Sequence, residues 1–188
     1  MERTTRSART VAMLLTFAAL AVFAPFGGTT LPTQADEAGE AGDSEEPLAG
    51  PATFADDVAV QIRDGLDGRG TEVINLRDAS DVVVDEAAVP AGAVLPWHTH
   101  PGPLVMVVAE GEFTYVSADD CVRRTYQEGE ALIDPGGDNI HTAYNPQEEG
   151  DTVLVAVYLG VPDDEELTTP VDADEAQALD EECGIDTS

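Results

Sequence analysis

Residues 92–103 read GAVLPWHTHPGP, and residues 129–145 read GEALIDPGGDNIHTAYN. These two stretches hold all three histidines of the 188-residue chain, His98, His100 and His141. Because side chains alternate along an extended segment, His98 and His100 point to the same side of it. His141 follows about 40 residues later, after several strand-like runs, and can complete a cluster of three imidazoles.

Neutral imidazole is a common protein ligand of zinc, iron, copper and nickel. The pattern therefore predicts a divalent transition metal (iron, manganese, nickel, copper or zinc) held by His98, His100 and His141, its identity left open. The alternative is a metal-free protein whose histidines bind a ligand directly or hydrogen-bond to one another.

The first stretch resembles the first motif of the cupin superfamily, which is a Gly, five residues, His-x-His, three or four residues, a Glu, six residues and a Gly. The residues that match it are Gly92, His98, His100 and Gly111. Leu104 stands where the motif has its Glu, so a carboxylate ligand is missing there. The nearest candidates to replace it are Glu110, Glu112, Tyr115 and Tyr144.

The second stretch resembles the second cupin motif. The matching residues are Gly129, Pro135, Gly137, His141 and Asn145, with one extra residue between Gly137 and His141. The resemblance implies an all-β fold, a cupin-type β-barrel or jelly roll (double-stranded β-helix), with the histidines projecting into its lumen. Many short strand-like runs separated by Gly, Pro, Asn and Asp favour the same class.

A three-histidine site with an open face is similar to that of the thiol dioxygenases and diketone-cleaving dioxygenases among the cupins, in which iron(II) binds substrate and dioxygen together. The resemblance thus implies a small-molecule oxygenase. The alternative is a non-catalytic ligand- or metal-binding cupin. Trp97, Leu104 and Tyr144 are the predicted substrate-binding residues, although a place in the core is the favoured alternative for Trp97 and Tyr144.

The sequence predicts four segments. Residues 1–35 read as a signal peptide, because three arginines precede an apolar run at 11–26 and a small-residue cleavage site. Residues 36–53 are predicted to be an acidic disordered linker, 54–162 the β-barrel domain, and 163–188 an acidic C-terminal tail with a helix over 172–182. The expected location is secreted or extracytoplasmic, without stable membrane association after cleavage. An uncleaved N-terminal membrane anchor is the alternative.

The chain is strongly acidic, with 38 Asp and Glu against 8 Lys and Arg and a net charge of −30. Such self-repulsion opposes compaction, and molar salt screens it by shortening the Debye length to about 3 Å. We therefore expect a halophilic protein; a cationic partner is the alternative. Nucleic acid is excluded as an expected partner because phosphate binding needs a basic patch.

Two cysteines, Cys121 and Cys183, are present. An even number in an exported chain favours a disulfide between them, worth up to about 4 kcal/mol on the loop-entropy model. A reactive thiol or metal ligand is the alternative. The layout resembles secreted single-domain cupins, and since many cupins pair through edge strands, the resemblance also implies a homodimer.

Overall fold

The computed structural model describes residues 42–43, 47–65, 68, 70–162 and 165–187. The predicted signal peptide, residues 1–35, lies outside the described residues. Within the part of the chain that is described, no helix has the length and apolarity needed to cross a membrane.

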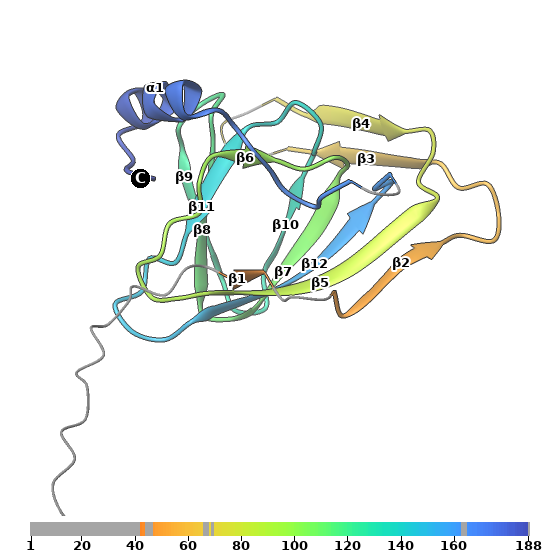
Figure 1. Cartoon of the computed structure of the whole chain (residues 1–188), viewed down its shortest axis with the longest axis horizontal. Coiled ribbons are helices and arrows are strands. Elements are labelled where there is room, and N and C mark those ends of the chain that lie inside the picture. The colour runs from red at the N-terminus through yellow and green to blue at the C-terminus, as the bar shows by residue number, and fades with distance from the viewer. Residues whose placement is uncertain (1–41, 44–46, 66–67, 69, 163–164, 188) are drawn as a thin grey trace, which may run out of the picture. The chain divides into compact units, whose positions relative to one another are not determined.

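Two antiparallel sheets form the body of the protein (Figure 1). The six-stranded sheet has the order β1-β5-β12-β7-β10, and β2 also pairs with β5. Its strands are β1 (Gly42–Asp43), β2 (Ala49–Thr53), β5 (Asp81–Val89), β7 (Leu104–Glu110), β10 (Ala131–Asp134) and β12 (Thr152–Leu159).

The five-stranded sheet has the order β13-β6-β11-β8-β9. Its strands are β6 (His98–Thr99), β8 (Glu112–Ser117), β9 (Arg123–Gln127), β11 (His141–Tyr144) and β13 (Thr169–Pro170). A separate hairpin is formed by β3 (Val60–Asp64) and β4 (Glu72–Leu76), and helix α1 (Ala173–Cys183) follows β13.

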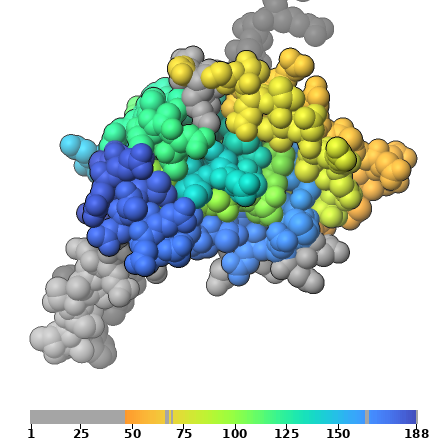
Figure 2. All heavy atoms as spheres, turned by 90° about the horizontal axis from the view of Figure 1, so that it is seen from above, coloured from red at the N-terminus to blue at the C-terminus, as the bar shows by residue number. Residues whose placement is uncertain are grey.

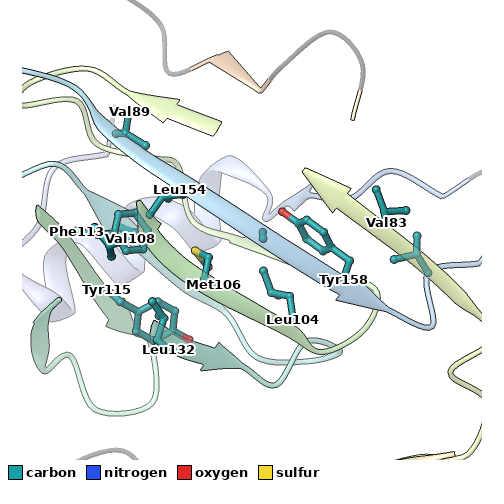
Figure 3. Close-up of a cluster of buried hydrophobic side chains, with 13 residues drawn as sticks. Val83, Val89, Leu104, Met106, Val108, Phe113, Tyr115, Leu132, Leu154 and Tyr158 are labelled. Carbon is teal, nitrogen blue, oxygen red and sulfur yellow. The ribbon is translucent and has the colours of Figure 1, made fainter. Parts of the chain in front are cut away.

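Hydrophobic side chains from both sheets meet between them (Figure 3). Strand β12 illustrates how the sequence produces this packing. Its residues alternate between buried and half-buried, as expected when one face of a strand packs on the core. Each fully buried large side chain contributes roughly 1.5–3 kcal/mol to folding. The core residues include Val83, Val89, Leu104, Met106, Val108, Phe113, Tyr115, Leu132, Leu154 and Tyr158. The predicted all-β jelly-roll barrel is confirmed.

Strand β2 lies inside the segment predicted to be a disordered linker, residues 36–53. It pairs with β5, although all five of its side chains are exposed. The prediction rested on the lack of apolar side chains to bury. A strand can instead be held by backbone hydrogen bonds to a neighbouring edge, which composition does not reveal.

The C-terminal helix predicted over 172–182 forms as α1, Ala173–Cys183. Asp172 is its N-cap, and its side chain accepts hydrogen bonds from the backbone N–H groups of Asp174 and Glu175. The carboxylates of these two residues lie in the first turn, where the helix dipole favours negative charge. Gly184 ends the helix in the left-handed conformation, with φ of 61°.

Cys121 and Cys183 form a disulfide, with 5.0 Å between their Cα atoms. The bond joins the turn after β8 to the last residue of α1. It thereby fastens the C-terminal segment to the five-stranded sheet.

Candidate metal centre

The three histidines lie in or directly after two paired strands of the five-stranded sheet. His98 in β6 lies directly opposite His141 in β11, and His100 follows on the same side of the chain two residues after His98. The ring centroids are 4.2 Å apart for His98 and His141, 4.9 Å for His98 and His100, and 5.0 Å for His100 and His141. One ring nitrogen from each lies within 4.8 Å of the others, so the three can share one ion.

The Nδ1 atom of each ring is engaged by a neighbour. His98 Nδ1 lies 2.6 Å from the carbonyl oxygen of Pro96, and His100 Nδ1 lies 2.7 Å from that of Leu167. His141 Nδ1 lies 3.1 Å from Asp134 Oδ2. Carbonyl and carboxylate oxygens accept hydrogen bonds but do not donate them. Each Nδ1 therefore carries the ring proton, and the lone pair of each Nε2 is left free to bind a metal.

His100 Nε2 is buried and has no hydrogen-bond partner among the described residues. A buried acceptor without a partner costs about 1–3 kcal/mol. A metal ion bound by the three Nε2 atoms would remove this cost. The donor set therefore fits a divalent transition metal.

Burial keeps the imidazoles of His98 and His141 neutral. It lowers the pKa of His98 to about 4, with a further contribution from repulsion by His100. Burial also lowers the pKa of His141 well below its ordinary value, and repulsion by His98 and His100 adds to the effect. Metal binding requires neutral imidazole, so near neutral pH these rings need not lose a proton first.

Asp134 is a buried carboxylate that the sequence analysis did not identify. It lies opposite Leu104 in the β7–β10 pair, so the structure has a carboxylate across the strand from the position where the cupin Glu is missing. Asp134 Oδ2 accepts from Tyr115 Oη at 2.8 Å and from Asn139 Nδ2 at 2.9 Å, and burial raises the pKa of this carboxyl. Its position beside His141 Nδ1 suits it to orient that ring rather than to bind the ion.

Replacing Asp134 by Asn should weaken metal binding about 10- to 100-fold, as the loss of a ligand-orienting carboxylate typically does. The measurement is competition for Co²⁺ against a chelator of known affinity. Asp138→Asn is the matched control, because it removes the same charge from an exposed position in the turn that follows β10. Equal losses in the two variants would contradict the orienting role.

A cavity of about 60 Å³ adjoins the histidines. Its polar lining residues are Asp85, His98, His100, His141, Tyr158 and Thr168, and the rest of its wall is apolar. Asp85 is 4% exposed and comes from the six-stranded sheet, whereas the histidines come from the other. A single carboxylate in the otherwise apolar run at 82–85 was the sequence signal that could have identified it.

The structure does not bring Trp97, Leu104 or Tyr144 to this cavity. Trp97 immediately precedes His98 and Tyr144 lies three residues after His141, so strand alternation turns both away from the lumen. They pack instead in a second cluster with Val116 and the disulfide. Leu104 is fully buried in the main core.

None of the predicted replacements for the missing Glu lines the cavity. Glu110 and Glu112 flank the β7–β8 turn and do not line the cavity. Tyr115 stacks on His141, with 4.9 Å between ring centroids, and its hydroxyl donates to Asp134.

Residues 86–158 match the family described as Cupin domain. No curated protein matches the chain significantly. The predicted resemblance to cupins is confirmed by this match.

Several solved structures are similar to part of the chain. A Klebsiella pneumoniae protein with a double-stranded β-helix domain is 25% identical, with a TM-score of 0.37, over 42% of this chain and 67% of that protein. A cupin-like protein of Thermotoga maritima is 17% identical, with a TM-score of 0.41; the match covers 52% of this chain and 72% of that protein. The polyketide cyclase RemF of Streptomyces resistomycificus is 22% identical, with a TM-score of 0.41; the match covers 50% of this chain and 63% of that protein. These similarities are too low to transfer an activity.

Proposed function

Residues 86–158 match the cupin domain, and on that premise we propose that the chain binds one divalent transition-metal ion through the Nε2 atoms of His98, His100 and His141. The observation that carries the proposal is the buried, unpartnered Nε2 of His100 beside two other neutral imidazoles. We further propose that the ion serves a small-molecule oxygenase, as in the three-histidine cupins that the motifs resemble.

Three neutral imidazoles would hold the ion without compensating its charge. A bound divalent metal would supply Lewis acidity there, and iron would also supply redox chemistry with dioxygen. Asp85 adds negative charge on the opposite wall of the cavity. The arrangement favours a small ligand that offers an anionic donor to the ion and a hydroxyl or amine to Asp85.

The size of the cavity supports a small ligand. Its volume of about 60 Å³ is far below the roughly 300–1,000 Å³ of sites for drug-sized molecules. Apolar side chains such as Met106, Phe113 and Leu154 form much of the wall, and they exclude water from around the ligand. In this dry setting a hydrogen bond to Asp85 orients the ligand strongly.

Oxygen uptake by the iron-loaded protein tests the oxygenase proposal, with small thiols and 1,3-diketones as probes. We expect uptake above that of free iron with at least one of the two classes. Asp85→Asn should lower kcat/KM about 10-fold or more through loss of a charged hydrogen bond, while iron content stays unchanged. Glu86→Gln is the control, because it removes the neighbouring charge from the exposed side of β5.

Full iron loading without oxygen uptake with any of the thiols or 1,3-diketones would overturn the oxygenase proposal. The alternative, a non-catalytic ligand- or metal-binding cupin, would then take its place. Oxygen uptake that is the same in Asp85→Asn and the wild type would contradict only the role of Asp85.

We also propose that the protein is exported and adapted to high salt, which the net charge of −30 and the disulfide support. The free energy of unfolding in urea should rise by at least about 2 kcal/mol between 0.1 and 2 M NaCl, as screening relieves carboxylate repulsion. Equal stability at both concentrations would contradict the adaptation. A homodimer and the lack of stable membrane association stay predictions.

A further inference from the structure

The C-terminal strap, residues 165–187, lies outside the segment that matches the cupin domain and yet reaches the histidines. The carbonyl oxygen of Leu167 accepts from His100 Nδ1 at 2.7 Å. The next residue, Thr168, lines the cavity. The tautomer and ring orientation of one candidate ligand therefore depend on a backbone atom of the strap.

Backbone pairing holds the strap beside the histidine strand. Strand β13 pairs with β6, with Pro170 opposite His98, and the N–H of Val171 donates to the carbonyl oxygen of Trp97 at 3.0 Å. These contacts fix the part of the strap that follows Leu167. Figure 2 shows the C-terminal segment, in dark blue, packed along the body of the protein.

Helix α1 provides a second anchor. The indole Nε1 of the fully buried Trp97 donates to Asp180 Oδ1 at 2.8 Å. Apolar side chains of the strap, among them Val171, Leu179 and Ile185, pack against the hydrophobic cluster that contains Trp97. Trp97, which precedes His98, thus connects the helix to the histidine strand.

The third anchor is covalent. Cys183, the last residue of α1, is bonded to Cys121 in the turn between β8 and β9. Arg123 Nη2 donates to the carbonyl oxygen of Gly184 at 2.8 Å beside it. Without the disulfide, the end of the strap would be held to the barrel by non-covalent contacts.

We propose that the C-terminal strap is a working part of the metal centre: it positions His100 through the Leu167 carbonyl, and the Cys121–Cys183 bond and the Trp97–Asp180 hydrogen bond keep it in place. The proposal rests on the proposed metal-binding function. It assigns to the disulfide a role in ligand geometry in addition to its role in stability.

The test measures Co²⁺ affinity and the visible Co²⁺ spectrum of the full chain. The double variant Cys121→Ser/Cys183→Ser should bind Co²⁺ about 10- to 100-fold more weakly and with an altered spectrum, as expected when a ligand loses its orienting partner. Val89→Ala is the control, because it truncates a core residue outside the cavity lining. It should lower the melting temperature while leaving the affinity and the spectrum unchanged.

A second pair of variants serves if the cysteine variant does not fold. Asp180→Asn keeps an oxygen acceptor for the Trp97 indole and should bind Co²⁺ as the wild type does, whereas Asp180→Ala should bind it several-fold more weakly. Wild-type affinity in Asp180→Ala or in the folded cysteine variant would overturn the role of the strap. So would an equal loss of affinity in Val89→Ala. Failure of the wild type to bind Co²⁺ would instead overturn the metal site itself.

Discussion

Replacing His98 by Ala is expected to weaken Co²⁺ binding by more than about 100-fold, which exceeds the usual effect of losing an orienting partner. The substitution removes one of three nitrogen donors that lie within 4.8 Å of one another. The remaining pair, His100 and His141, cannot offset the loss, because Asp134 faces the Nδ1 side of His141 and Asp85 is not part of the cluster. His141→Ala should behave in the same way.

Thr99→Ala is the matched control for these substitutions. It alters the residue between His98 and His100, and the side chain of Thr99 alternates away from theirs. Its affinity for Co²⁺ should equal that of the wild type. Unchanged metal binding in both His98→Ala and His100→Ala would show that these rings are not ligands.

The stability of the metal-free protein should fall as the pH is lowered from 6.5 towards 4. The pKa of His98 is about 4 in the folded protein and 6.5 ordinarily, so the unfolded chain binds the proton more tightly. The contribution of this ring is fully present above pH 6.5 and is lost progressively down to pH 4, about 3 kcal/mol in total. The lowered pKa of His141 acts in the same direction. The raised pKa of Asp134 acts in the opposite direction and offsets part of the loss.

Urea unfolding in chelator at pH 7.5 and pH 4.5 measures this effect. Molar salt is needed throughout, since protonation of the many surface carboxylates would otherwise change stability by itself. The comparison is with His98→Asn, which cannot titrate at that position. The wild type should lose about 2–3 kcal/mol more than the variant between the two pH values. Parallel pH profiles would contradict the burial of a neutral His98.

The sequence was sufficient to predict the histidine cluster because its geometry is largely local. His98 and His100 are two residues apart, in and directly after β6, and only one non-local pairing, of β6 with β11, brings His141 to them. The all-β class followed from equally local features, which were short apolar runs separated by turn residues.

The surroundings of the cluster depend on strand register, which a single sequence does not reveal. Asp134 reaches its place through the pairing of β10 with β7, and Asp85 through the pairing of β5 with β12. The positions of Trp97 and Tyr144 have a simpler cause. Their parity relative to the neighbouring histidines puts both on the other face, which agrees with the core position that the sequence favoured for them.

The C-terminal strap was the least predictable part. Its acidic composition suggested a tail, and nothing in the residues near Leu167 indicates that a backbone carbonyl there accepts from His100. The disulfide could be predicted from the cysteine count, but its position relative to the histidines could not. Backbone atoms carry no sequence signal, so contacts of this kind become visible only in the folded structure.

The metal content of the full chain, produced without a histidine tag, tests the central claim most directly. Elemental analysis after reconstitution with a single divalent transition metal and removal of excess should give close to one equivalent per chain. A content near zero under these conditions would contradict the account, and the cluster of His98, His100 and His141 would then be no more than a buried group of neutral side chains.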